Sequence, residues 1–63
     1  MNLKRIGNEV SFKRKSLGLN QKELADKCGV SFKTISTIEN GKDTSTNCLG
    51  KVLFLLKIEL EIK

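Results

Sequence analysis

The side chains that could do chemistry in this chain are mostly cations rather than catalytic groups. The 63 residues include twelve Lys and Arg but no His and no Tyr. No nucleophile is paired with a general base, and no glycine-rich stretch resembles a phosphate-cradling loop. The sequence therefore predicts a binding protein with no catalytic residues, and an enzyme is the least favoured interpretation.

Two cysteines, Cys28 and Cys48, could in principle bind a metal or form a disulfide. They form no CxxC pair, and there is no His to complete a tetrahedral zinc site. We expect two reduced cysteines that act as small apolar side chains, with a disulfide as the alternative. No cofactor and no metal site are expected.

Positive charge is concentrated in the first two thirds of the sequence. Residues 1–42 carry nine Lys or Arg and four Asp or Glu, whereas residues 43–63 carry three of each kind. A basic unit followed by a neutral one is typical of a protein whose first part faces a polyanion. The longest apolar run, residues 52–56, is too short to span a bilayer, and residues 1–10 lack the apolar core of a signal peptide. We therefore expect a cytoplasmic protein with no membrane partner.

The apolar pattern predicts helices that would position these charges. Apolar residues repeat with helical spacing over residues 3–17, and Gly18 can end that helix. Asn20 followed by Glu23 predicts a capping box at the start of a short helix over residues 21–28.

Two further helices are expected after a turn. Ser31 is the expected N-cap of a third helix, which Asn40 and Gly41 close. A fourth helix would run over residues 46–56 with four apolar side chains inward, namely Leu49, Val52, Leu53 and Leu56.

The second and third helices have the features of a helix-turn-helix unit. Ala25 is small where the two helices would touch, and Gly29 lies where the chain must turn sharply. Val30, Ile35 and Ile38 would anchor the third helix on the second. An ordinary helical hairpin is the alternative, but spacing, caps and charge together favour DNA binding.

Five short strings in this region are shared with a known family. They are Leu17-Gly18-Leu19-Asn20-Gln21, Glu23-Leu24-Ala25, Gly29-Val30-Ser31, Thr34-Ile35-Ser36 and Ile38-Glu39-Asn40-Gly41-Lys42. Through them the chain resembles the Cro and phage-repressor (XRE-type) helix-turn-helix family over residues 3–56. The resemblance implies a mainly α domain of four to five helices with residues 31–40 as its recognition helix. It also implies a bacterial or phage transcription regulator that lies on the nucleoid when bound to DNA.

The resemblance assigns DNA contacts position by position. Phosphate contacts, which fix register but do not read sequence, are implied for Gln21, Ser31, Asn40 and Lys42. Base contacts are implied for Phe32, Lys33, Ser36 and Thr37. Lys33 could donate to guanine, Phe32 could touch a thymine methyl group, and Thr37 could serve either kind of base pair. Phe32 replaces the more common polar residue at its position, so a contact with a sugar is the alternative.

Arg14 and Glu39 match a family pair that forms a partly buried ion pair between the first and third helices. Arg14 falls on the apolar face of its helix, which favours this pair over a cation facing the DNA backbone. Such a pair can add little net stability, but loss of one partner leaves the other charge buried and unpaired.

The last seven residues change the hydrophobic period. Residues 57–63 alternate polar and apolar side chains, which predicts a half-buried strand. Here the chain resembles HipB-type antitoxins, in which such a strand pairs with its twin in a second subunit. The dimerisation residues Ile58, Leu60 and Ile62 would then cover the fourth helices of both subunits. We therefore expect a DNA-binding domain over residues 1–56 and a dimerisation strand after it. A frayed tail, or a fourth helix that continues, is the alternative.

Phe12 stands nearly opposite the apolar face of its helix and should be exposed. A single exposed aromatic is ordinary, and the alternative is an anchor for another protein such as a toxin.

Three binding functions follow, in order of preference. The first is a repressor of its own operon that is also the antitoxin of a HipA-like kinase. The second is a stand-alone phage-type or restriction-modification controller without a toxin, and the third is an interaction protein that does not read DNA. The expected partners are double-stranded DNA with an inverted-repeat operator, a second copy of the chain in a homodimer, and in the first case the toxin.

Overall fold

Four helices follow one another in the computed structural model, which describes the backbone of residues 2–62 and the side chains of residues 2–57. They are α1 (Leu3–Ser16), α2 (Gln21–Cys28), α3 (Phe32–Glu39) and α4 (Thr46–Ile62). The prediction of a mainly α domain that contains a helix-turn-helix is confirmed.

Short polar side chains explain where the helices begin. The Asn20 side chain accepts a hydrogen bond from the Glu23 backbone N–H at 2.7 Å, and the Glu23 carboxylate accepts one from the Asn20 N–H at 2.8 Å. This capping box starts α2. The Ser31 hydroxyl accepts a bond from the Thr34 N–H at 3.2 Å and starts α3 in the same way. Between the two helices Gly29 adopts φ 73°, a left-handed conformation that favours glycine.

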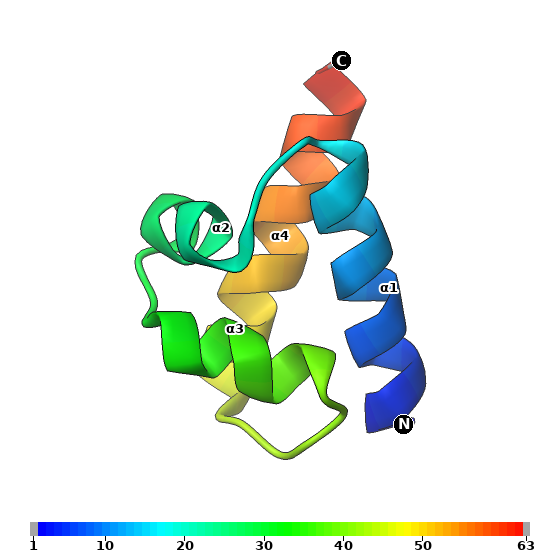
Figure 1. Cartoon of the computed structure of the whole chain (residues 1–63), viewed down its shortest axis with the longest axis vertical. Coiled ribbons are helices and arrows are strands. Elements are labelled where there is room, and N and C mark those ends of the chain that lie inside the picture. Colours follow the sequence, from blue (N-terminus) through cyan, green and yellow to red (C-terminus); the bar gives the residue numbers. More distant parts are fainter. Residues whose placement is uncertain (1, 63) are drawn as a thin grey trace.

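The helix α4 runs between α1 and α2, and α3 crosses in front of it in this view (Figure 1). The helix α3 packs against α1 and α2, and α4 packs against the same two helices. The buried core among the described side chains consists of Val10, Leu24, Ala25, Ile35, Ile38, Leu49, Val52 and Leu56. It includes the small residue and two of the anchors expected from the helix-turn-helix pattern, so the core fixes how α3 lies on α2.

The predicted C-terminal strand is wrong. The backbone of α4 stays helical through Lys57 to Ile62 and crosses the expected domain boundary without a break (Figure 1). A lone strand would leave its backbone N–H and C=O groups unpaired, whereas a helix pairs them within one segment. The Leu, Glu and Lys residues of this segment are also good helix formers. The expected strand pairing across a dimer through Ile58, Leu60 and Ile62 is lost with the strand, and their side chains lie outside the described residues.

One core assignment in α4 is also wrong. Leu53 is expected to point inward but is 37% exposed, whereas Val52 and Leu56 are fully buried. Successive helical residues are rotated by about 100°, so Leu53 lies at the margin of the face that Val52 and Leu56 present to the core. Within residues 2–62, every helix falls short of the length and hydropathy needed to cross a membrane.

Candidate functional site

The helix α3 presents one side to the core and the other to solvent. Ile35 and Ile38 are buried, at 0% and 3% exposure. The predicted base contacts lie on the rest of the helix, with Phe32 and Lys33 exposed and Ser36 and Thr37 half-buried. The hydroxyl of Ser36 accepts a long hydrogen bond from the Asn40 side chain, at 3.5 Å. The structure thus brings the four predicted base contacts onto one short helix whose opposite side is locked in the core.

The predicted phosphate contacts lie around α3 rather than on its outer side. Gln21 is the first residue of α2 and is half-buried, whereas Asn40 and Lys42 are exposed just after α3. Ser31 precedes α3, and its hydroxyl is engaged with the backbone N–H and the hydroxyl of Thr34. These residues border α3 at both ends, an arrangement suited to contacts with two stretches of DNA backbone.

A buried polar network joins α3 to the rest of the domain. Arg14 Nε donates to Glu39 Oε2 at 2.7 Å and Arg14 Nη2 donates to Glu39 Oε1 at 3.2 Å. Arg14 Nη1 donates to the Leu19 carbonyl oxygen at 2.7 Å. The side chains of Arg14 and Glu39 are 10% and 8% exposed. The ion pair therefore ties the end of α3 to both α1 and the connection that follows it.

Gln21 also belongs to this network, which the sequence does not reveal. Its Nε2 donates to Glu39 Oε1 at 3.1 Å, across 18 positions of the chain. The contact depends on how α2 and α3 cross, so no local spacing signals it. A predicted DNA contact and a buried structural pair are thus directly connected.

The helices α1 and α3 come closest at Gly7, which is buried. A Cβ atom there would overlap the carbonyl oxygen of Ile38 and would lie 3.1 Å from that of Glu39. After α3, Gly41 has φ 73°, and a Cβ there would lie 2.8 Å from the Lys4 Cα. These two close approaches set the position of α3 and of the turn after it on α1. A glycine on the apolar face of a helix is the sequence signal that could have revealed the first of them.

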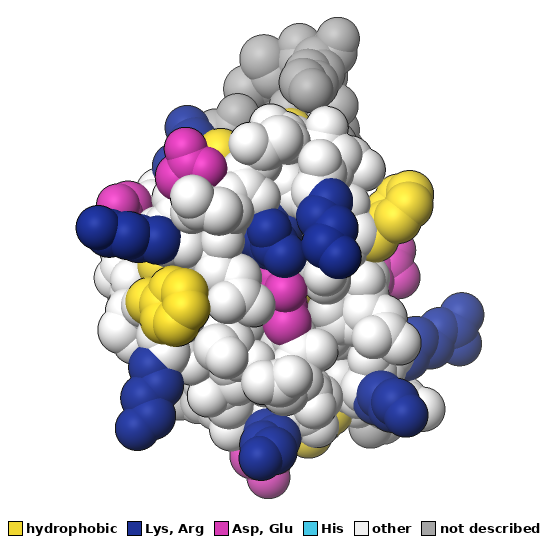
Figure 2. Space-filling view, in the orientation of Figure 1, with side chains coloured by type: hydrophobic (Ala, Val, Ile, Leu, Met, Phe, Trp, Pro, Cys, Tyr) yellow, Lys and Arg dark blue, Asp and Glu magenta, His cyan; other side chains and the backbone are white. Residues whose placement is uncertain are grey.

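Basic side chains surround the face formed by α1, α2 and α3. Figure 2 shows Lys and Arg both around the rim of this face and near its middle, where an acidic side chain lies beside them. The chain carries a formal net charge of +5. An excess of positive charge attracts a polyanion.

The two cysteines lack the features of reactive groups. Both are free and half-buried. Burial raises the pKa of the Cys28 thiol above its ordinary value, which makes it a poorer nucleophile and metal ligand at neutral pH. Among the described residues, no three His, Cys, Asp or Glu side chains are arranged to hold a metal ion.

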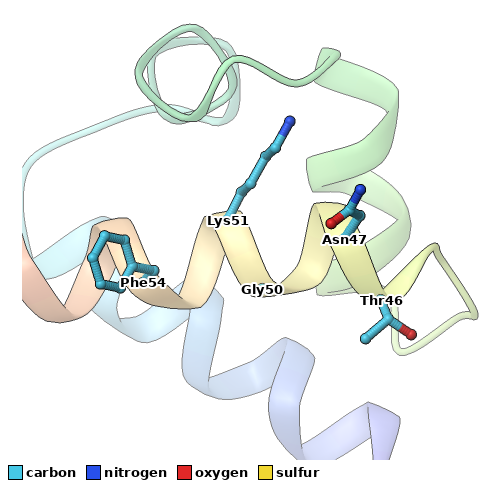
Figure 3. A pocket seen from close by; sticks show the side chains of 5 residues that line it. All are labelled: Thr46, Asn47, Gly50, Lys51 and Phe54. Carbon is cyan, nitrogen blue, oxygen red and sulfur yellow. The ribbon is translucent and has the colours of Figure 1, made fainter.

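Two exposed aromatic residues lie outside this site. Phe12 on α1 is 72% exposed. Phe54 on α4 is 66% exposed and lines a shallow groove of about 530 Å³ (Figure 3). The other lining residues are Thr46, Asn47, Gly50 and Lys51, all from the same helix. None of the predicted DNA contacts lines this groove.

Comparison with known proteins agrees with the geometry of α2 and α3. Residues 12–47 match the family model described as "Helix-turn-helix". Over 60 residues, the chain is 35% identical to the "ImmF control region 10 kDa protein" of Bacillus phage phi105. That match covers 94% of this chain and 67% of the phage protein.

Proposed function

Because the chain belongs to the helix-turn-helix family, whose members are DNA-binding regulators, we propose that it is a stand-alone repressor of the phage type that reads its operator with α3. The observation that supports this proposal most directly is the division of α3 into two sides. Its inner residues are buried in the core, whereas its outer residues are accessible to a base edge. The name of the phage relative, which refers to a control region, favours the same function.

The proposed docking places α3 in the major groove and the start of α2 against the backbone. Helix-turn-helix proteins dock with the second helix of the motif in the major groove. Gln21, Ser31, Asn40 and Lys42 would then contact phosphates at the two ends of α3. These contacts hold the protein in register and carry no sequence information themselves.

Sequence would be read by the four outer residues of α3. Exposed Lys33 would donate to guanine O6 or N7, and exposed Phe32 would pack on a thymine methyl group. Ser36 and Thr37 are half-buried and would reach only the bases directly beneath the helix. The readout would therefore depend most on the two residues of the first turn.

An antitoxin role with a HipA-like kinase as partner is the second candidate. Its main support in the sequence is the C-terminal strand, and α4 is helical there. Exposed Phe12 is compatible with a protein partner but does not identify one. We therefore rank the antitoxin role below the stand-alone regulator.

Two substitutions separate base reading from backbone contact. Selection of bound duplexes from a random pool first gives the operator. We expect Lys33→Ala to relax the preference at one base position by about 1–3 kcal/mol, because one base contact is lost. Gln21→Ala should weaken binding to all sequences alike, by about 1 kcal/mol. Titration of a matched series of duplexes, followed by fluorescence anisotropy, measures both effects.

Lys57→Ala is the matched control, since Lys57 is an exposed lysine on α4 and its loss changes the net charge by the same amount. It should leave the base preference unchanged. Equal effects of Lys33→Ala and Lys57→Ala on every duplex would contradict the proposed role of α3.

A further inference from the structure

The carboxylate of Glu39 receives donors from two different helices. Oε2 accepts from Arg14 Nε at 2.7 Å, and Oε1 accepts both from Arg14 Nη2 at 3.2 Å and from Gln21 Nε2 at 3.1 Å. The Glu39 side chain is 8% exposed, so these donors take the place of water. One buried carboxylate thus fixes α1, α2 and α3 relative to one another.

This arrangement determines which way the Gln21 amide faces. A carboxylate paired with an arginine accepts hydrogen bonds and donates none, so the nitrogen of the amide must face Glu39. An amide nitrogen carries two hydrogens, and only one of them points at Oε1. Among the described residues, the Gln21 side chain makes no other hydrogen bond, so its second N–H is available to a partner outside the protein.

The available N–H lies where a helix already attracts anions. Gln21 is the first residue of α2, and the Asn20 side chain caps the N–H of Glu23. The first backbone N–H groups of a helix have no acceptor within it and favour a phosphate oxygen. A glutamine that rotated freely would also present its carbonyl oxygen here, and that oxygen would repel a phosphate.

We propose that Glu39 is a positioning residue for DNA binding, which holds the Gln21 amide so that its second N–H points at a backbone phosphate. The proposal rests on the proposed function, since it requires DNA at this end of α2. Glu39 makes no contact with DNA itself and acts through Gln21. The Arg14 guanidinium holds the carboxylate in place through two hydrogen bonds.

A double-mutant cycle on DNA affinity tests this role. The variants are Gln21→Ala, Glu39→Gln and the two together, and the probe is a mixed-sequence duplex of about 20 base pairs at low salt, because a phosphate contact is independent of sequence. We expect each single change to weaken binding by about 5–10-fold, in line with the net contribution of one hydrogen bond. The double variant should be weaker than either single variant by less than about 2-fold. Affinities are corrected for the folded fraction, measured by circular dichroism at the same temperature.

Asp26→Asn is the matched control, because Asp26 is an exposed carboxylate on α2 and the change removes the same single negative charge as Glu39→Gln. Its DNA affinity should stay within about 2-fold of wild type. A loss of DNA affinity in this control as large as that of Glu39→Gln would overturn the proposal. A double variant whose loss of affinity equals the product of the losses of Gln21→Ala and Glu39→Gln would also overturn it. Either result would leave Glu39 with a role in folding alone.

A spectroscopic measurement covers the case in which Glu39→Gln does not fold. In the ¹H–¹⁵N spectrum of the wild-type protein, the side-chain NH₂ pair of Gln21 should shift when the duplex is added. An NH₂ pair that stays unmoved at saturation would overturn the positioning role while DNA binding itself stands. Failure of the wild type to bind any duplex would overturn the proposed function, and this proposal with it.

Discussion

At the scale of single residues, Arg14 shows how one side chain can serve the fold and the site together. Its guanidinium spans Glu39 on α3 and the carbonyl of Leu19 between α1 and α2. A planar group with several fixed donors suits this bridging geometry, which a lysine could not reproduce. The C-terminal end of α3 is held by charge as well as by apolar packing.

We expect Arg14→Ala to lower the free energy of unfolding by about 3 kcal/mol. The reason is that the Glu39 carboxylate, which is 8% exposed, would lose its cationic partner. Urea denaturation followed by circular dichroism measures the change.

Lys15→Ala is the control, because Lys15 is exposed on the same helix, and it should change stability by less than about 0.5 kcal/mol. Equal stabilities of the two variants would mean that the ion pair contributes nothing to the fold.

At the scale of elements, two glycines inside helices have opposite surroundings. Gly7 in α1 is buried against the carbonyl oxygens of Ile38 and Glu39, so α1 and α3 touch backbone to backbone. Gly50 in α4 is exposed, and a Cβ there would meet nothing within 4 Å. The first glycine is required by packing, and the second only weakens its helix.

The same substitution should therefore have opposite effects at these two positions. Gly50→Ala should stabilise the protein by about 0.5–1 kcal/mol, because alanine favours a helix interior. Gly7→Ala should destabilise it by about 1–3 kcal/mol, because α1 and α3 must move apart. Thermal or urea unfolding of both variants measures the two values, and each is the control for the other. Stabilisation by Gly7→Ala would contradict the close approach of α1 and α3.

Local chemistry explains which elements can be predicted from the sequence. The starts of α2 and α3 follow from capping by Asn20 and Ser31, since a cap acts over only three or four residues. The C-terminal segment is mispredicted because its alternation of polar and apolar side chains covers only seven residues. So short a pattern is also compatible with a helix when no second strand is present to pair with the segment. The Gln21–Glu39 contact and the close approach at Gly7 depend on how helices cross, which no local pattern specifies.

At the scale of the whole molecule, the surface proposed for base contacts is small, and its size limits how well one chain can discriminate among DNA sites. In the proposed docking, base reading falls to α3, which is eight residues long, and one such helix covers few base pairs. A single 7.0 kDa chain would therefore discriminate poorly among sites. We propose that two copies bind one operator as a homodimer on an inverted repeat.

The stoichiometry on selected DNA tests this proposal. Sedimentation of a labelled duplex that carries the full selected site should show two chains bound per duplex. A duplex with one half-site is the control and should bind one chain, with lower affinity. One chain on the full site, bound as tightly as on the half-site, would exclude the homodimer.

The division of α3 into a fixed side and a free side has a consequence for how this protein can evolve. Its inner side chains, Ile35 and Ile38, are committed to the core, but Phe32 and Lys33 contribute nothing to it. Mutations at the outer positions can thus accumulate without first unfolding the chain. Under the proposed function, substitutions of Phe32 and Lys33 would change the operator that is read, whereas substitutions of Ile35, Ile38 or Gly7 would disturb the fold first.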